Sequence, residues 1–517
     1  MKFFSKKTFA TLLFLAILSL PAVSPLFHKG FFVTDDGEWM IIRFSAFHQA
    51  FRDGELPVRL LGRLNQEFGY PVANFLYPGF MYLAEPFHII GFNFVDSIKI
   101  VLGLSLLLSG VFTYFWLRKF FNKFPSAIGA LFYIYTPYHL YDVYKRGSVG
   151  EVLALAIVPF ILWQIERKSI LFASLGIGLL LLAHNTLAIL FLLLILCYML
   201  LEILLSKNRR QPVYQYTSIL VIGFGLSAFF WLPALLELRY TVFSQTTIAH
   251  WGEYFSSVPL LGYSTLFVVV ATVVAFLFKK INIKKHRLTL LLFVFCIISL
   301  FLSSALSSLV WNILPVDFVQ FPFRFLSVTI LCSAFLAACL TSLLKGTKQY
   351  VLGFIFIIVL IISAAQFIKT SQSFDRGEGY YATNMATTTV QDEYMPVWVK
   401  EKPLQRAEKK VEIIKGKGVV QNISYTNKKV SFTANIEKSA LVRVNMIYWP
   451  GWEAFVDNKP VSISYNNPTG LIEFLLSEGK HEVQIRFGET PLRMLADAVS
   501  GVSLLTLLIW SVIKRKR

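Results

Sequence analysis

Two adjacent carboxylates, Asp35 and Asp36, follow the first hydrophobic segment of the chain, so they are expected at a membrane surface. A carboxylate pair just outside a bilayer can act as a general base or hold a cation. The alternative is a solvated loop in which an aspartate caps the next helix. The residues that follow predict an amphipathic helix. Its apolar positions are Trp39, Met40, Phe44 and Phe47, and its polar positions are Arg43 and Arg52.

Other uncommon polar residues fall between hydrophobic runs on the same predicted side. They are Glu38, Arg146, Glu151, His184, Asn185, Asp317, Gln320 and Arg324. Ionisable residues at membrane depth are costly, and they usually face a cavity or a partner. Arg324 starts a span, so it is either a snorkelling anchor or a guanidinium for a lipid-borne phosphate. Arg146 and Glu151 form either part of a site or a simple pair, and His184 with Asn185 is either part of a site or a helix-connecting turn.

The elements that must position these residues are membrane helices. Of the 517 residues, 56% are hydrophobic and only 15% are charged, and the mean hydropathy is +0.60. The apolar residues form runs long enough to cross a bilayer, which indicates a polytopic membrane protein. Much of the net charge of +19 lies in short clusters between these runs, as the positive-inside rule expects. No nucleic-acid motif is present, so the charge does not indicate a nucleic-acid partner.

The hydrophobic runs predict about twelve transmembrane helices with both termini in the cytoplasm, in a prokaryotic plasma membrane. Residues 213–236 and 288–309 are each expected to form one span. The predicted organisation is a transmembrane domain at 1–368 with a long first outer loop at 26–97, an extracytoplasmic β-sandwich at 369–491, and a last helix with a basic tail at 492–517.

The β-domain prediction rests on alternating apolar and polar residues. Residues 430–436, 441–447 and 481–487 alternate as strands do, and 454–463 indicates a hairpin with Asp457 and Asn458 at its turn. Trp449 and Trp452 are expected either in the core of this domain or on a surface that faces sugar. The four cysteines all lie in apolar runs, so no disulfide is expected in the outer domain.

Several enzyme classes find no support in the sequence. It contains no P-loop, no dinucleotide fingerprint and no zinc motif. It also lacks the Gly-x-Ser-x-Gly elbow of the hydrolases. These absences argue against a soluble nucleotide-dependent enzyme.

The chain resembles the GT-C superfamily of membrane glycosyltransferases. The shared features are a first span, a long first outer loop that opens with adjacent acidic residues, and many further spans. Its pattern is nearest to the YfhO-like group and to the family labelled 6-pyruvoyl-tetrahydropterin synthase-related. The resemblance is carried by Asp35-Asp36, 53–57, 69–71, 74–78, 146–151, 184–185, 320–324, 393–396, 448–452 and 456–460. The zinc histidines of a pterin synthase are not recognisable, so no pterin chemistry is expected.

The resemblance implies transfer of a sugar from a polyprenyl-phosphate-type lipid donor to an extracytoplasmic acceptor, which is a cell-envelope glycan, a lipid or a protein. An acidic residue of the first outer loop is the base in such enzymes, and this role falls on Asp35 or Asp36, with Asp35 preferred. Displacement at the anomeric carbon also needs a cation for the departing phosphate. Arg146 and Arg324 are the candidates for that role.

Four residues are expected to support this site, namely Glu151, His184, Asn185 and Gln320. No cofactor is required by the pattern, and a divalent cation such as Mg²⁺ or Mn²⁺ is left open, because an acidic pair alone does not prove one. Two other functions share the same polar cavity and outer domain. One is a non-enzymatic transporter or flippase of lipid-linked saccharide, and the other is a scaffold in envelope assembly.

Overall fold

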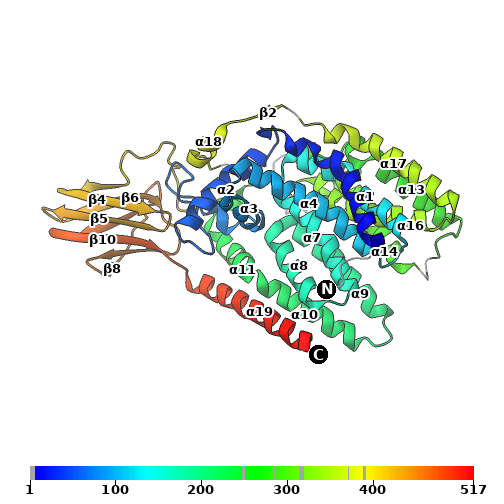
Figure 1. Ribbon diagram of the computed structural model, residues 1–517. Coiled ribbons are helices and arrows are strands. Elements are labelled where there is room, and N and C mark those ends of the chain that lie inside the picture. The colour runs from blue at the N-terminus through cyan, green and yellow to red at the C-terminus, as the bar shows by residue number, and fades with distance from the viewer. Residues whose placement is uncertain are drawn as a thin grey trace.

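The computed structural model describes residues 6–246, 251–282, 284, 286–313, 319–370, 372–387 and 392–516. Figure 1 shows a helical bundle with a β region at one end, and the last helix, α19 (Pro491–Lys516), running back along the bundle. The helices before the β region are α1 (Lys6–Val23), α2 (Gly37–Arg52), α3 (Gly79–Ile89), α4 (Phe94–Leu117), α5 (Lys123–Tyr135), α6 (Pro137–Tyr141), α7 (Val149–Glu166), α8 (Ile170–Ala183), α9 (Asn185–Leu205), α10 (Arg210–Leu226), α11 (Ala228–Glu237), α12 (Val258–Leu261), α13 (Tyr263–Leu277), α14 (Arg287–Ser303), α15 (Ser308–Ile313), α16 (Leu326–Ser342), α17 (Thr347–Ile368) and α18 (Gly377–Thr383).

Six helices within the described residues are long and apolar enough to cross a membrane. They are Phe94–Leu117, Val149–Glu166, Asn185–Leu205, Pro322–Ser342, Thr347–Ile368 and Pro491–Ile513. The number rises to eight if each of two bent helix pairs counts as one span. The polytopic helical architecture predicted from the sequence is therefore present, while the count of about twelve spans stays a prediction.

Two segments expected as single spans are bent. The chain turns by 70° between α10 and α11 and by 83° between α14 and the segment Ala305–Ile313. At the first bend the Ser500 hydroxyl of α19 accepts from the backbone N–H of Phe229 at 2.8 Å and donates to the carbonyl of Gly225 at 3.0 Å. A side chain from another helix thus satisfies backbone groups that the break leaves without helical partners.

The β region contains two antiparallel sheets. The five-stranded sheet has the order β4-β5-β10-β7-β8, and the three-stranded sheet has the order β3-β6-β9. Their strands are β3 (Val411–Lys415), β4 (Gly418–Thr426), β5 (Lys429–Ile436), β6 (Ala440–Ile447), β7 (Trp452–Val456), β8 (Lys459–Val461), β9 (Leu471–Leu476) and β10 (Gly479–Phe487). Every second residue of β5 is buried, as period-two alternation requires. The C-terminal β region before the last helix is confirmed, and its arrangement as a sandwich stays a prediction.

Local predictions in this region agree with the structure. Asp457 and Asn458 form the turn between β7 and β8 with φ of 48° and 63°, the left-handed pair that a two-residue hairpin needs. Trp449 and Trp452 are only 1% and 3% exposed, which favours the core position over the sugar-facing one. Trp449 packs edge-on against Phe75 of the first outer loop, with 5.7 Å between ring centroids.

The apolar face predicted for α2 is confirmed at Met40, Phe44 and Phe47, which are 3%, 0% and 0% exposed, and the prediction is wrong at two positions. Trp39, placed on the apolar face, is 38% exposed, whereas Arg43, placed on the polar face, is 7% exposed. The Arg43 guanidinium lies 3.6 Å from the sulfur of Met40. The helix packs against α3, α4 and α18, so neighbouring elements rather than water surround most of its circumference.

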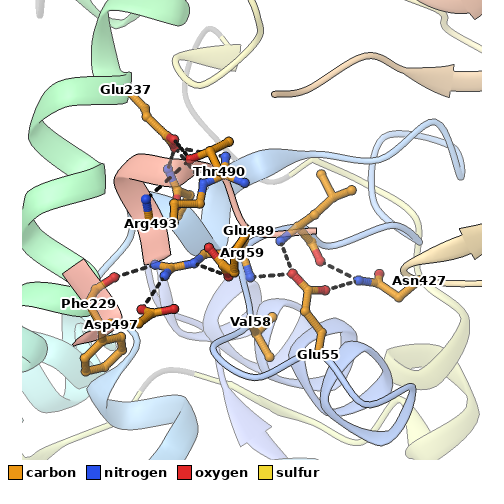
Figure 2. Close-up of polar contacts among 12 residues, drawn as sticks. Glu55, Val58, Arg59, Phe229, Glu237, Asn427, Glu489, Thr490, Arg493 and Asp497 are labelled. Atoms are coloured by element: carbon orange, nitrogen blue, oxygen red, sulfur yellow. Dashed lines mark hydrogen bonds and ion pairs between the residues drawn. The ribbon is translucent and has the colours of Figure 1, made fainter. Parts of the chain in front are cut away.

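A buried set of charged residues joins the first outer loop, the β region and α19; we call it the polar junction (Figure 2). Arg59 lies at its centre and is 2% exposed. Its guanidinium donates to Glu489 at 3.1 Å, to Asp497 at 3.0 Å and to the carbonyl of Phe229. One side chain therefore contacts the end of the β region, the last helix and α11.

Glu55 extends the polar junction toward the β region. Its Oε1 accepts from the backbone N–H groups of Arg59 at 2.7 Å and Leu60 at 3.1 Å, and its Oε2 accepts from the side-chain amide of Asn427. Burial raises the pKa of Glu55 to about 7, although these three donors favour its ionised form.

Glu237 completes the polar junction on the bundle side. Its Oε2 accepts from Arg493 Nε at 3.2 Å, from Arg493 Nη2 at 3.0 Å and from Asn74 at 2.7 Å. These bonds join α11, α19 and the loop segment 26–97.

Candidate active site

The loop that carries the acidic pair is held by backbone hydrogen bonds. The Asp35 N–H donates to the carbonyl of Lys145 at 3.0 Å, and the Asp36 N–H donates to the carbonyl of Arg146 at 2.8 Å. The acceptors belong to a π-helical turn, Asp142–Arg146, that precedes α7. Such turns are rare and often occur at functional sites.

The same contact explains a glycine at the end of that turn. Gly147 has φ of 64°, and a Cβ there would lie 2.8 Å from the backbone of Gly37. Only glycine permits both this left-handed conformation and this approach. A short strand pair, β1 (Phe31–Phe32) with β2 (Ser373–Phe374), fixes the loop from its other side.

Glu151 is the centre of a buried network. Its Oε1 accepts from Arg146 Nη1 and from Arg324 Nε, the latter at 2.9 Å, and lies 3.5 Å from His184 Nε2. Its Oε2 accepts from the Tyr138 hydroxyl at 3.1 Å. Glu151 is fully buried, so the two guanidinium groups compensate a charge that would otherwise be costly.

Arg146 links this carboxylate to the surface. It is 2% exposed, and it donates to Asp142 at 3.2 Å and to Asp36 at 3.2 Å. Burial, followed by the charge of Glu151, raises the pKa of Asp142 well above its usual range. Asp142 Oδ2 is buried and has no hydrogen-bond partner among the described residues. We call Asp36, Asp142, Arg146, Glu151, His184 and Arg324 the Glu151 network.

Arg324 reaches the network from the start of the α16 span. Its Nη1 donates to the carbonyl of Val319 at 2.9 Å and to Gln320 Oε1 at 2.6 Å, and its guanidinium lies 4.8 Å from the ring of Phe321. Its Nη2 makes no hydrogen bond to the described residues. Both arginines predicted to bind phosphate are thus already paired with Glu151, and only Arg324 keeps a terminal amino group for another anion.

The two members of the acidic pair differ in their surroundings. Asp36 is paired with Arg146, and its side chain is 39% exposed. Asp35 is exposed, and within the described part of the chain its carboxylate has no hydrogen-bond partner. Partial burial of the group, and then the charge of Asp36, raise the pKa of Asp35, while the charges of Arg146 and Lys145 lower it. An exposed carboxylate with a raised pKa is well suited to accept a proton.

The remaining predicted residues have structural contacts as well. His184 Nδ1 accepts from the backbone N–H of Leu187 at 3.2 Å, so a neutral ring carries its proton on Nε2, toward Glu151. Asn185 donates to the carbonyl of Phe75 at 3.0 Å and lies outside the Glu151 network. Asp317, named from the sequence, lies outside the described residues.

Sequence reasoning missed three residues of the site. Asp142 and Tyr138 bind the network, and Lys145 lies close enough to Asp35 for its charge to lower the pKa of that carboxyl. Asp142 precedes Arg146 by four residues, a helical spacing that was available as a signal. Among the described residues no group of three or more His, Cys, Asp or Glu side chains is placed to hold a metal. The open question of Mg²⁺ or Mn²⁺ is not tested by this.

A model of the 6-pyruvoyl-tetrahydropterin synthase related domain, described as a membrane protein, matches residues 76–371, which is more than half of the chain. The chain belongs to this family of membrane proteins. The matched range contains Arg146, Glu151 and Arg324, while Asp35 and Asp36 precede it. The sequence-based recognition of this family is confirmed.

Solved structures with a similar fold include the mycobacterial arabinofuranosyltransferase AftD. The likeness has a TM-score of 0.52 at 14% identity and covers 73% of this chain but 28% of that protein. The oligosaccharyltransferase of Archaeoglobus fulgidus has a TM-score of 0.44 at 15% identity. This match covers 75% of this chain and 58% of the oligosaccharyltransferase chain. The likeness to AftD concerns the fold alone. Comparison with curated proteins finds no match.

Proposed function

We propose that this protein is a glycosyltransferase that moves a sugar from a polyprenyl-phosphate-type lipid donor to an extracytoplasmic acceptor. The observation that carries the proposal is the unequal acidic pair. Asp36 is held by the buried Arg146, while Asp35 beside it is exposed and has no hydrogen-bond partner among the described residues. The fold shared with an arabinofuranosyltransferase supports glycosyl transfer.

In this mechanism Asp35 takes the proton of the acceptor hydroxyl. The hydroxyl oxygen then bonds to the anomeric carbon as the bond from that carbon to the donor phosphate oxygen breaks. Arg324 Nη2 and Lys145 stabilise the negative charge that remains on the phosphate. Asp36 and Arg146 are positioning residues, because they hold the loop that presents Asp35.

The membrane arrangement is part of the proposal. Both termini face the cytoplasm of a prokaryotic cell, and the β region and acidic pair face outward, where a sugar donor must arrive on a lipid. Reporter fusions after residues 348 and 517 should be cytoplasmic, and one within 422–480 should be external. A cytoplasmic signal from the last site would contradict both the sidedness and the site.

Transfer assays on purified protein with a panel of radiolabelled polyprenyl-phosphate sugars test the chemistry. We expect Asp35→Asn to lower turnover by about a hundredfold or more, the usual size of a general-base contribution. Asp375→Asn is a matched control, because Asp375 is an exposed carboxylate beside the same loop and pairs with Lys29. All three proteins should unfold at the same temperature.

A variant of Arg324 separates the binding of the donor phosphate from the role of Asp35 as the base. Arg324→Lys keeps a charge but loses the planar fork, so it should raise KM for the donor as well as lower kcat. Full transfer by the double variant Asp35→Asn, Asp36→Asn would overturn the enzyme proposal. Transport of lipid-linked saccharide, or a scaffold role in envelope assembly, would then account better for the Glu151 network.

A further inference from the structure

A second concave site lies in the outer part of the molecule, separate from the Glu151 network. It is a cavity of about 300 Å³ where residues 66–68 of the first outer loop meet the segment 406–410 and strands β4 and β6. This volume is at the lower end of the range for small-molecule sites.

Hydrogen bonds between separate segments hold the walls of this cavity. The side-chain amide of Asn445 donates to the carbonyl of Lys409 at 2.7 Å. The backbone N–H of Ile447 donates to the carbonyl of Phe68 at 2.8 Å, and that of Gln66 donates to the carbonyl of Met385 at 3.1 Å. A ligand would therefore find a site that is already formed, which lowers the entropic cost of binding.

The charges in the cavity are unevenly paired. The Glu67 carboxylate binds Arg406, with distances of 3.0 Å to Nε and 2.9 Å to Nη2. The ammonium of Lys410 instead donates to the backbone carbonyl of Glu67 at 2.7 Å and lies 5.2 Å from the centre of the Tyr425 ring. No carboxylate among the described residues forms an ion pair with Lys410.

Lys410 is therefore a largely buried cation with room for an anion. Its pKa is lowered to about 8, mainly by burial; the charge of Glu67 raises the pKa and the charge of Arg406 lowers it. Lys409 lines the same cavity, so basic groups outnumber the acidic pair Glu67 and Glu408. A bound carboxylate or phosphate would offset this excess.

The cavity also offers a surface for a sugar ring. Tyr425 is 46% exposed and Ile423 is 38% exposed, both on β4 at the edge of the five-stranded sheet. A bulge between Gln421 and Ser424 shifts the register of β4 against β5. Aromatic rings that are apolar on their faces and polar at one end suit the mixed surface of a sugar. The amides of Gln66 and Asn445 lie in the same lining.

We propose that this cavity binds an anionic sugar unit, meaning a sugar ring that carries a carboxylate or a phosphate. Lys410, with Lys409 and Arg406 nearby, takes the anionic group, and Tyr425 with Ile423 contacts the ring. The inference does not depend on the proposed transferase activity, because the cavity shares no residue with the Glu151 network.

Binding to the purified full-length protein in detergent tests this directly. Saturation-transfer NMR is suited to the weak affinities of single sugars. The probes are D-glucuronate, D-glucose 6-phosphate, neutral D-glucose and inorganic phosphate. At least one of the two anionic sugars should bind about tenfold or more tightly than glucose and than phosphate, which corresponds to about 1.4 kcal/mol. The stronger of the two identifies the preferred anion, and its affinity should fall with added salt.

Variants locate the binding. Each of the variants Lys410→Gln and Tyr425→Ser should lower the affinity for the anionic sugar by about tenfold or more. Arg406→Gln provides a second, safer variant, because this side chain is 52% exposed and its loss frees the Glu67 carboxylate to compete for Lys410. Lys438→Gln, at an exposed turn between β5 and β6, should change nothing. Two outcomes would overturn the proposal. One is equal binding of all four probes, and the other is full affinity in the folded Arg406 and Tyr425 variants.

Discussion

The polar junction and the Glu151 network both bury arginines against carboxylates, yet they differ in the exposed residues that lie next to them. Arg59 of the polar junction is 2% exposed and donates to two carboxylates and a carbonyl. Both networks leave buried polar atoms without a partner among the described residues, namely Glu489 Oε2 and Arg493 Nη1 in the polar junction and Asp142 Oδ2 in the Glu151 network. The exposed Asp35 lies beside it.

This difference separates a structural network from one prepared for a ligand. A buried ion pair contributes little net stability, but removing one partner leaves an uncompensated charge and is strongly destabilising. The polar junction uses that penalty to join three segments that are distant in sequence. The Glu151 network has the same kind of buried pairs, but the exposed carboxylate of Asp35 lies beside it, where a substrate can reach that group.

The largest expected effect is a break of the polar junction. Arg59→Met leaves Glu489 and Asp497 without their shared cation and should lower the free energy of unfolding by about 3–5 kcal/mol. The matched control is Arg486→Met, since Arg486 is exposed on β10. Thermal unfolding and limited proteolysis between the β region and the bundle measure the effect. An unchanged Tm in the Arg59 variant would show that the junction does not hold the two parts together.

A pair of amide substitutions compares the two networks directly. Glu237→Gln removes the charge that compensates the fully buried Arg493, so it should lower the free energy of unfolding by about 3 kcal/mol or more. Asp142→Asn should lower the free energy of unfolding by less, by about 1 kcal/mol, because burial and the charge of Glu151 raise the pKa of Asp142 and so disfavour the charge that the substitution removes. Chemical denaturation of both variants gives the two values. Equal losses would contradict the distinction between the networks.

The pH dependence of stability isolates Glu55. Its pKa is about 7 in the folded protein against 4.5 in a free side chain, so the folded state keeps this proton longer. The protonated Glu55 side chain contributes fully to the free energy of unfolding below pH 4.5. This contribution is lost as the pH rises through about 7, and the loss amounts to about 3 kcal/mol. Tm measured between pH 5 and 8 should therefore fall more in the wild type than in Glu55→Gln. Glu453→Gln, at an exposed position, should keep the wild-type slope.

The cavity around Lys410 gives the smallest expected effect. Binding of an anionic sugar requires the protonated amine, whose pKa is about 8. Affinity should be constant below that pH and should fall by about tenfold per pH unit above it, while the sugar carboxylate stays ionised. Titrations of D-glucuronate from pH 6 to 10 measure this dependence, with Arg406→Gln as the variant that lowers affinity at every pH. A flat profile would remove Lys410 from the binding site.

Local sequence patterns predicted the parts of the fold that depend on near neighbours. The turn at Asp457 and Asn458 and the strand over 430–436 follow from backbone preference and alternation, and both are present. The hydrophobic runs likewise predicted membrane helices. The face of α2 was predicted wrongly at two positions, because helical periodicity assumes water on one side. Trp39 lies outward and Arg43 inward where α3, α4 and α18 pack around the helix.

The sequence by itself determined that this chain spans a membrane, carries a β region before its last helix, and places Asp35 and Asp36 after its first hydrophobic segment. These features follow from composition, alternation and adjacency in the chain. Only the tertiary structure decided that Glu151 is shared by Arg146 and Arg324, residues that are 5 and 173 positions away from it. It also decided that Asp36 is paired while Asp35 is exposed. Long-range ion pairs depend on how helices pack, and a buried carboxylate selects whichever cations that packing brings within reach.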